Sequence, residues 1–372
     1  MNLARHDFRA SVAPLSTARS MPSGFYTDPE IFALEREHIF LKQWFFIGRE
    51  DQFPNSGDYR AVDTPGGPIV TVRGRDGKLR CFANYCRHRG SILLEGEGNC
   101  GNRIICPYHA WSYINDGTLY GCPDMQDAEG FDRVENGLVP LKTETWEGYV
   151  FASFHPDVKP LIEHLGDFPQ RFASHKLGDM RCTWKMTLEA QCNWKLLLEN
   201  SMETYHTGIV HKHTVGAQKS RTLKTRGDWI CIQVLSDRSI ATLPGQEPPF
   251  PPIPELDEDA KLGTYFTVIY PTTQFAVSQD ALWWLNVTPV SVNRSLLEIG
   301  GCFPESALAD PRFAEKAEPY YERWAAVGRE DVGILEKQQR ALASALYKPG
   351  PLSGRDDMVQ ALGVWVLDRL PI

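Results

Sequence analysis

Two histidines five residues apart, His206 and His211, stand at the end of a helical pattern that covers residues 196–205. Gly208 disfavours a helix, so we expect the helix to end near it. On a continuous helix, residues five apart lie about 140° apart around the axis, and both rings could not reach one ion. Where the helix has ended they can, and two imidazoles joined by one distant carboxylate suit non-haem Fe(II). The spacing alone equally fits a pair of histidines on the protein surface.

A second set of possible ligands lies upstream, in Cys86-x-His88 and Cys106-x-x-His109. Each pair offers one thiolate and one imidazole from a short loop, and by ligand type alone the four residues could bind zinc. Zinc sites usually space their ligands as Cys-x2–4-Cys and His-x3–5-His, which is not the pattern here. Cys-x-His followed by Cys-x-x-His is the order of a Rieske [2Fe–2S] cluster, in which two thiolates hold one iron and two imidazoles the other. We therefore interpret these four residues as cluster ligands.

The sequence between these two loops contains a glycine motif, Gly96-x-Gly98-x-x-Gly101, which matches a dinucleotide-binding pattern. That function requires a strand before the first glycine and a helix after the last one. Here the glycines lead into strand-like residues, 103–105, which continue to the second ligand loop. We interpret the motif as a hairpin between the loops, with no dinucleotide site.

The composition argues against several classes of partner. The 372 residues are 42% hydrophobic and carry a formal net charge of −8, and without clusters of Lys and Arg we expect neither nucleic acid nor membrane as a partner. No apolar run reaches the length of a membrane span, and the first residues lack the apolar segment of a secretory signal. Nine cysteines scattered over a long chain are expected to be reduced thiols and metal ligands. This favours a cytoplasmic location.

The elements that must hold the Cys/His loops are short strands. Thr27-Asp-Pro-Glu30 is a capping pattern that predicts a helix over residues 28–42. Runs of β-branched and aromatic residues then alternate with Gly and Pro turn signals at the spacing of an all-β domain. The expected strands cover residues 59–62, 68–73, 79–83, 103–105, 111–114 and 147–154. We predict a small all-β domain over residues 43–155.

The two histidines are expected in a mixed domain formed by residues 1–42 and 156–372. A polar helical segment over 157–172 and a strand over 180–190 precede them. Further strands are expected at 229–235, 239–243, 264–270, 274–277, 282–287 and 296–303. Helices are expected at 310–327, 329–346 and 356–368. A long antiparallel sheet with terminal helices makes the fold class α+β.

With both ligand sets placed, the chain resembles the oxygenase (alpha) component of Rieske non-haem iron oxygenases over nearly its full length. Beyond the two Cys/His loops, the matching motifs are Asn193-Trp-Lys, Glu203-x-Tyr-His206-x4-His211 and Glu330-Asp331-x7-Gln339. The resemblance implies a small all-β Rieske domain and a helix-grip catalytic domain, in which an antiparallel sheet carries helices.

The same resemblance implies the ligands of both centres. The cluster ligands would be Cys86, His88, Cys106 and His109. The ligands of the mononuclear iron would be His206, His211 and Asp331, with Glu330 as the alternative to Asp331. The implied cofactors are therefore a [2Fe–2S] cluster and mononuclear Fe(II).

Glu203, three residues before the first iron histidine, stands at a position with a catalytic role in the family. Electrons pass through a carboxylate at this position from the cluster of one subunit to the iron of its neighbour in a trimer, so the resemblance implies a homotrimer. Most ring-dihydroxylating members carry Asp there. Glu in a Glu-x-Tyr-His context resembles the branch that acts on quaternary ammonium compounds such as glycine betaine, stachydrine and carnitine.

The resemblance implies hydroxylation or oxidative N-demethylation of a small organic substrate, with O2 and electrons from NAD(P)H. The sequence shows no nicotinamide or flavin site, so we expect a separate NAD(P)H-dependent flavin or iron–sulfur reductase as a partner. Within the family, the alternative is the alpha subunit of an aromatic-ring hydroxylating dioxygenase. Outside it, an electron carrier of the Rieske ferredoxin type would need only the all-β domain, and a binding protein on a helix-grip scaffold would need no iron.

Aromatic residues on the strands expected to line the iron cavity could form a cage around a cationic substrate. The candidates are Tyr265, Tyr270, Phe275, Trp283 and Trp284. They could equally pack in the core. Neighbouring residues of a strand face opposite sides, so at most one of Trp283 and Trp284 should face the cavity. A small cation predicts an acidic or aromatic pocket, whereas an aromatic acid predicts an Arg or Lys in it; the sequence places neither.

Overall fold

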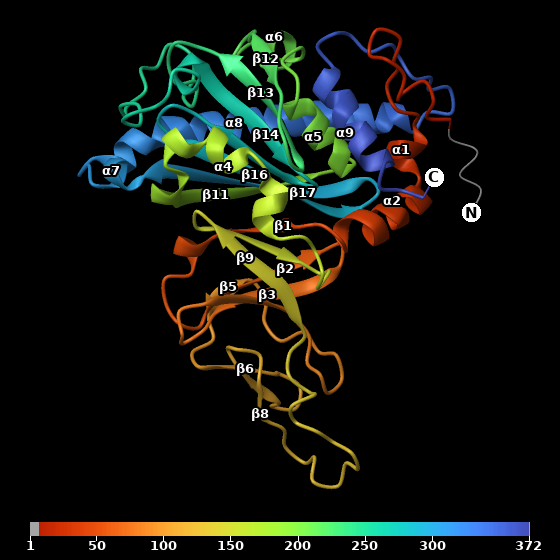
Figure 1. The fold of residues 1–372 in the computed structure, drawn as a ribbon, viewed down its shortest axis with the longest axis vertical. Helices are drawn as coiled ribbons and strands as arrows, with labels where there is room; N and C mark the ends of the chain where they lie inside the picture. Colours follow the sequence, from red (N-terminus) through yellow and green to blue (C-terminus); the bar gives the residue numbers. More distant parts are fainter. Residues whose placement is uncertain (1–6, 372) are drawn as a thin grey trace. The chain divides into compact units, whose positions relative to one another are not determined.

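The computed structural model describes residues 7–371, and the chain divides into two compact units (Figure 1). We call residues 40–161 the β unit and the other described residues, 7–39 and 162–371, the mixed unit. The domain expected over residues 43–155 lies within the β unit. In the part of the chain that the structure describes, none of the helices combines the length and the apolar character that crossing a bilayer requires.

The β unit consists of short antiparallel strands. A seven-stranded sheet has the order β1-β10-β9-β4-β3-β2-β5, and a three-stranded sheet has the order β6-β7-β8. The strands are β1 Phe45–Arg49, β2 Asp58–Thr64, β3 Gly67–Arg73, β4 Leu79–Ala83, β5 Glu97–Asn99, β6 Arg103–Ile105, β7 Ser112–Ile114, β8 Leu119–Gly121, β9 Pro140–Trp146 and β10 Tyr149–Ser153. A 3-10 turn covers Glu50–Gln52.

The strand expected over residues 147–154 is shorter in the structure, because its first two residues form a hairpin turn. Trp146 pairs with Tyr149, and the two residues between them, Glu147 and Gly148, have φ values of +49° and +77°. A two-residue hairpin turn of this kind requires positive φ at both positions. The sequence prediction therefore missed β9, the strand on the other side of this turn.

The glycine motif between the ligand loops contains β5 and continues into β6. A strand, not a helix, follows its last glycine. The motif therefore lacks the helix N-terminus that a dinucleotide pyrophosphate needs.

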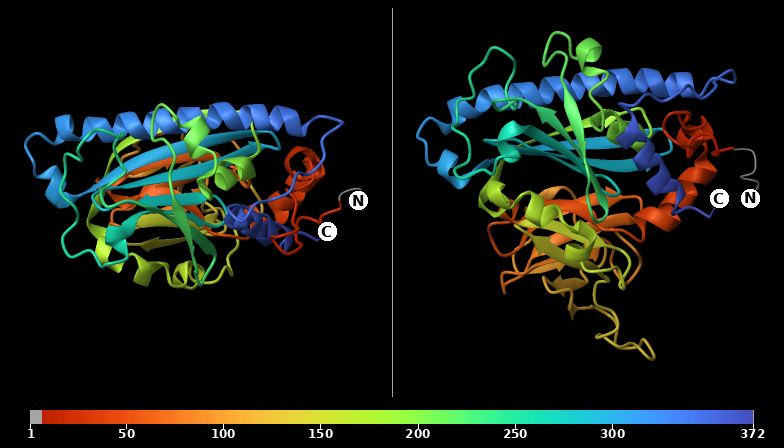
Figure 2. Two further views of the ribbon diagram at one scale, coloured as in Figure 1. Left: turned by 90° about the horizontal axis from the view of Figure 1, so that it is seen from above. Right: turned by 45° about the horizontal axis from the view of Figure 1, so that its top comes forward.

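The mixed unit is built on one antiparallel sheet with the order β11-β17-β16-β15-β14-β13-β12. The strands are β11 Met180–Ala190, β12 Ser220–Leu223, β13 Trp229–Leu235, β14 Gly263–Ile269, β15 Thr273–Val277, β16 Leu282–Ser291 and β17 Arg294–Pro304. The longest helix, α8, runs along this sheet (Figure 2).

The helices of the mixed unit lie before, between and after its strands. They are α1 Gly24–Thr27, α2 Pro29–Glu35, α3 Leu161–Leu165, α4 Phe168–Arg171, α5 Trp194–Ser201, α6 Thr207–Val210, α7 Glu305–Leu308, α8 Phe313–Leu342 and α9 Asp357–Leu367. A π-helical turn at Arg36–Phe40 follows α2, and 3-10 turns cover Ala173–His175, Leu177–Asp179 and Ala260–Leu262.

Two helix predictions failed at glycines. The helices expected over 310–327 and 329–346 are one helix, α8, in which Gly328 faces the sheet; a Cβ there would lie 2.8 Å from Ile299 Cδ1. This glycine allows close packing and does not end the helix. The helix expected over 157–172 is broken instead, because Gly166 has φ +59° and a Cβ there would clash with the backbone oxygen of Arg226.

The strand expected over residues 239–243 is also wrong, since this segment forms no regular element. The hydroxyl of Ser239 donates to Asp280 Oδ1 at 2.5 Å and accepts from the backbone N–H of Ala241 at 3.1 Å. Side-chain hydrogen bonds of this kind compete with the ladder of a sheet. They hold the segment as a loop.

The segment before the two histidines is fixed by buried polar contacts of α5. The ammonium of Lys195 forms a fully buried ion pair with Glu35, which also accepts a hydrogen bond from Trp194 Nε1 at 2.8 Å. One turn on, Glu199 accepts from the hydroxyl of Tyr26 at 2.8 Å. These contacts connect α5 to α1 and α2, and they leave α5 little freedom to slide or rotate.

Glu199 makes the stability of the mixed unit depend on pH. Burial raises its pKa to about 8, against the opposing effects of the Tyr26 hydrogen bond and of Lys195. The native chain therefore keeps a proton that the unfolded chain releases above its usual pKa of about 4.3, so stability falls as the pH rises from there to about 8. A neutral amide at this position has no proton to lose.

We expect Glu199→Gln to gain stability relative to the wild type between pH 6 and pH 9, by on the order of 2 kcal/mol. Denaturant unfolding at a series of pH values measures this difference. Glu322→Gln, at an exposed position of α8, is the control and should follow the wild type. The same pH dependence in all three proteins would show that Glu199 is ionised throughout this range.

Candidate metal centres

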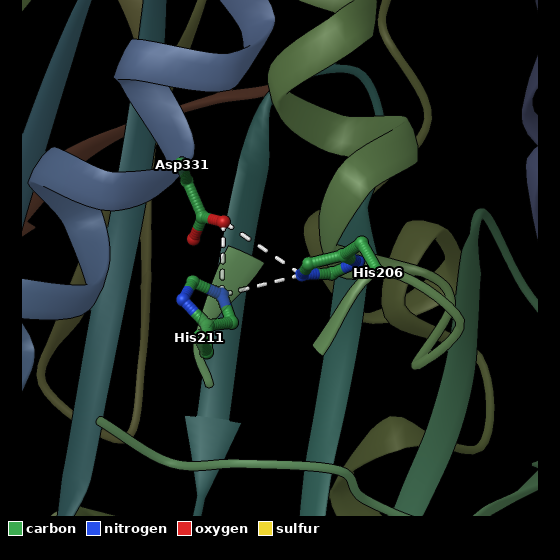
Figure 3. A group of neighbouring side chains, drawn as sticks. All are labelled: His206, His211 and Asp331. Atoms are coloured by element: carbon green, nitrogen blue, oxygen red, sulfur yellow. Dashed lines mark hydrogen bonds and ion pairs between the residues drawn. The ribbon is translucent and has the colours of Figure 1, made fainter. Parts of the chain in front are cut away.

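His206, His211 and Asp331 converge in the mixed unit (Figure 3). The two Nε2 atoms are 3.3 Å apart, and Asp331 Oδ1 lies 3.0 Å from that of His211 and 3.7 Å from that of His206. Among the residues that the structure describes, these three are the His, Cys, Asp or Glu residues whose ligand atoms lie close enough together to hold one metal ion. Asp331 Oδ1 is also buried and accepts no hydrogen bond, which is unfavourable unless a cation lies beside it.

Local structure explains how two histidines five residues apart reach one point. The helix α5 ends at Ser201, earlier than the expected end near residue 208, and α6 begins at Thr207. His206 precedes α6 and His211 follows it. The two imidazoles therefore approach from opposite ends of one short helical turn, while Asp331 reaches them from α8.

Two further carboxylates lie behind the histidines. His206 Nδ1 lies 2.6 Å from Glu203 Oε1, and His211 Nδ1 lies 2.7 Å from Glu330 Oε2. A carboxylate that accepts an Nδ1–H fixes the ring orientation and leaves the Nε2 lone pair free for a metal. Glu330 therefore faces the far side of His211, and Asp331 is the acidic residue that faces both Nε2 atoms.

The three groups fit a non-haem iron. Two imidazoles and one carboxylate on one side of an ion form the facial set that leaves coordination positions open in Fe(II) oxygenases. The outer carboxylates Glu203 and Glu330 give both rings the tautomer that this set requires.

A cavity of about 70 Å³ adjoins this group. One wall is formed by side chains at alternating positions of the sheet strands, and the other wall is one face of α8. The sheet side contributes Ile232, Val234, Phe266, Gln274, Trp283, Leu285 and Ile299, and α8 contributes Arg323, Trp324, Val327, Gly328 and Asp331. The cavity is mainly apolar and aromatic, with a guanidinium in its wall.

Of the five aromatic candidates, Trp283 alone lines this cavity. Its neighbour Trp284 faces the other side, as predicted. Tyr270 stacks on Trp365 of α9 at 4.1 Å between ring centroids, and Phe275 packs against Phe168. Tyr265 lies against Phe172. These four residues belong to the core, and the sequence prediction missed Phe266, Trp324 and Arg323.

The two Cys/His loops of the β unit have the same backbone structure. In each loop the cysteine carbonyl accepts the N–H of the residue four positions on, Gly90 or Ala110, at 2.9 and 3.1 Å. Both of those residues have positive φ, +75° and +58°. Each loop is therefore a tight turn that contains one cysteine and one histidine.

The ligands of these loops pair by type. Burial and the neighbouring thiol of Cys106 raise the pKa of Cys86, and the rings of His88 and His109 are 4.8 Å apart between centroids. In the described chain the four do not gather about a single point as the iron group does. Two thiolates on one side and two imidazoles on the other fit a two-iron cluster, whereas zinc would need all four around one ion. The cysteines are buried and the histidines are exposed.

A paired Cys/His site on a β domain and a facial iron site on an antiparallel sheet together define a Rieske non-haem iron oxygenase. The Rieske [2Fe–2S] domain family matches residues 43–140, and the catalytic domain of ring hydroxylating alpha subunits matches residues 177–372. This chain belongs to the ring hydroxylating alpha subunit family. The predicted fold class, α+β with a Rieske and a catalytic domain, and the predicted cofactors, a [2Fe–2S] cluster and mononuclear iron, are confirmed.

Individual relatives resemble the chain to different extents. The carnitine monooxygenase oxygenase subunit of Escherichia coli (strain K12) is 36% identical over 196 residues, 52% of each chain, so the chain spans about half the length of this relative. The glycine betaine monooxygenase oxygenase subunit of Pseudomonas aeruginosa (strain UCBPP-PA14) is 25% identical over 90% of this chain and 85% of its own. A solved structure of a quaternary ammonium Rieske monooxygenase has a TM-score of 0.82 at 26% identity, covering 96% of this chain and 97% of that one.

We expect His206→Ala to lose the mononuclear iron and to keep the cluster, because the two centres are built in different units. Iron analysis should fall from about three to about two atoms per chain, while the reduced protein keeps the EPR signal of a mixed Cys/His cluster. His213→Ala removes an exposed imidazole of the same segment and should change neither quantity. Loss of both centres in His206→Ala would contradict the assignment of the iron to the mixed unit alone.

Proposed function

We propose that this chain is the oxygenase component of a multicomponent Rieske oxygenase that hydroxylates or oxidatively N-demethylates a small quaternary ammonium compound. The observation that carries the proposal is the presence of both centres in one chain: paired Cys/His loops, and His206, His211 and Asp331 beside a cavity. When bound, the cluster supplies single electrons and the iron supplies the reactivity toward O2. An electron carrier would need only the first centre, and a binding protein would need neither.

The overall reaction determines which reactants and how many electrons the chain must receive. One C–H bond of the substrate, O2, two electrons and two protons give one C–OH bond and one water. If the carbon oxidised is an N-methyl of a quaternary ammonium, the hydroxylated product breaks its C–N bond and releases formaldehyde, a proton and the tertiary amine. The chain offers no source of the two electrons, so a separate NAD(P)H-dependent flavin or iron–sulfur reductase is part of the proposal.

The surface at the cluster loops supports a protein partner for electron transfer. His88 and His109 are exposed, and beside them Ile105 and Tyr108 are 58% and 55% exposed. Exposed apolar side chains around redox-active imidazoles suit transient docking. We propose that this surface meets the reductase and, in a homotrimer, a neighbouring subunit. All nine cysteines are free thiols, which supports the proposed cytoplasmic location.

The substrate class rests on the cavity and on the relatives. Phe266, Trp283 and Trp324 give the cavity three aromatic side chains, and aromatic faces attract quaternary ammonium groups. Relatives named for carnitine and for glycine betaine support the same class. An aromatic-ring substrate is the alternative.

Oxygen uptake separates these two classes. Purified protein with a surrogate reductase and NADH should consume O2 when γ-butyrobetaine or glycine betaine is added, and should release one formaldehyde per O2. Naphthalene and benzoate should give no product. Uptake and diol formation with the aromatic compounds, and none with the ammonium compounds, would show that the chain is a ring dioxygenase.

Glu203 is proposed as the carboxylate through which the electron enters the iron site. Its Oε1 lies 2.6 Å from His206 Nδ1. It lines the iron cavity and also a second cavity of about 270 Å³, whose wall includes Tyr347 and Asp356. Glu203 can therefore contact the iron histidine on one side and a group from outside the mixed unit on the other.

We expect Glu203→Gln to retain both centres and the trimer but to pass the electron from cluster to iron at least tenfold more slowly. An amide keeps the size of the side chain but loses the negative charge that orients the imidazole of His206. Single-turnover stopped-flow of the pre-reduced protein with O2 and γ-butyrobetaine measures cluster reoxidation. Glu330→Gln makes the corresponding change behind His211 and should stay closer to the wild-type rate. Wild-type reoxidation in an iron-loaded Glu203→Gln trimer would assign the electron another path.

A further inference from the structure

The guanidinium of Arg323 lies in the wall of the iron cavity without a polar partner. The residue is 3% exposed, its Nε is buried without a hydrogen bond, and no ion pair or hydrogen bond to another described residue engages the rest of the group. The guanidinium lies over the ring face of Trp283, at 4.7 Å from Cζ to the centroid. Arg323 is also one of the residues that line the cavity.

Such an arrangement is unfavourable for the chain alone. Burial lowers the pKa of Arg323 to about 10, although the negative charge of Asp331 opposes this change, so the group remains charged at neutral pH. A buried charge without a hydrogen-bonded counter-ion is destabilising, and an aromatic face offsets this only in part. Elsewhere in the mixed unit a buried cation is paired, as Lys195 is with Glu35. The unpaired position of Arg323 therefore points to a ligand that brings its own negative charge.

On α8, Arg323 and the iron ligand Asp331 are attached more than two turns apart. Arg323 precedes Asp331 by eight residues, which is about 12 Å along a helix axis. Trp324, Val327 and Gly328 line the cavity between them. The carboxylates of the cavity, Glu203 and Asp331, lie at the histidine end. The cavity thus has an anionic end at the iron site and a cationic end at Arg323.

We propose that Arg323 binds a carboxylate of the substrate, so that the substrate is a small zwitterion with its oxidisable N-methyl toward His206 and His211. Only the ammonium part of this inference rests on the proposed function; the carboxylate part rests on Arg323. A planar guanidinium offers two parallel N–H donors that match a carboxylate. Arg323 would therefore determine specificity, selecting amino acid betaines over choline-like alcohols.

The test is a binding measurement with two probes that differ only in the negative charge, γ-butyrobetaine and its methyl ester. Titration calorimetry on the purified full chain should show the acid binding at least tenfold more tightly than the ester. Arg323→Met and Arg323→Gln should weaken binding of the acid by about 10- to 100-fold, the range for hydrogen bonds to a charged group. Binding of the ester should change little, and Arg323→Lys should recover part of the loss. Arg340→Gln, at an exposed position of the same helix, should bind both probes as the wild type does.

A third probe, benzoate, distinguishes failure of this inference from failure of the proposed function. Equal affinity of the wild type for acid and ester would overturn the role of Arg323 and leave the ammonium substrate standing. Binding of benzoate that depends on Arg323, with no binding of either ammonium compound, would support the carboxylate site and overturn the ammonium assignment. No dependence on Arg323 for any of the three probes would overturn the inference.

Thermal unfolding without ligand separates binding from a structural role. Because Arg323 is an unpaired buried charge, Arg323→Met should unfold at the same temperature as the wild type or a higher one. γ-Butyrobetaine should then stabilise the wild type and leave this variant unchanged. A lower unfolding temperature for Arg323→Met, with equal weakening of acid and ester, would show that the arginine only supports the cavity wall.

Discussion

The iron site depends on the register of α8 against the start of α5, and the side chain of Gln339 helps to fix it. Gln339 Oε1 accepts the backbone N–H of Asn193 at 2.9 Å, while the side chain of Asn193 caps α5 by accepting from the N–H of Lys195 at 3.1 Å. Gln339 lies eight residues beyond Asp331 on the same helix. A shift of α8 by one residue would break this contact and move Asp331 away from the imidazoles, so the late Gln339 motif has a positioning role.

Buried charge in the mixed unit follows two patterns with different consequences. Where it supports the fold, it is matched, as the ammonium of Lys195 is with Glu35. Where it faces the cavity, it is not: in the described chain, Asp331 Oδ1 and Arg323 Nε are buried without a hydrogen bond. The matched groups hold α5 in place. The unmatched groups are those that a bound metal ion and a bound anion would neutralise. Charges that are held in position before binding favour binding, but they lower the stability of the fold.

Local spacing decided the parts of the prediction that succeeded. The cluster loops are short, and their hydrogen bonds span four or five residues, so the Cys-x-His and Cys-x-x-His spacings contain most of the geometry. The strands of the β unit followed from their turn residues for the same reason. The glycines were less informative: Gly166 and Gly328 are the same residue type, yet one breaks a helix and the other permits its contact with Ile299. Only the packed neighbour distinguishes these two cases.

By itself, the sequence predicted the fold class, the two Cys/His loops and the pair His206 and His211, because each of these patterns lies in residues close together in the chain. The choice of Asp331 over Glu330, 120 residues away, depends on tertiary structure. Tertiary structure alone decided which cavity residues matter. Tyr265 is buried and its neighbour Phe266 is half-buried, and only the packed structure shows that Phe266 is the one that lines the cavity. A helix broken at Gly328 separated Arg323 from Asp331 in the prediction. One continuous α8 puts both on the cavity wall, a placement that depends on packing against β17 and not on local propensity.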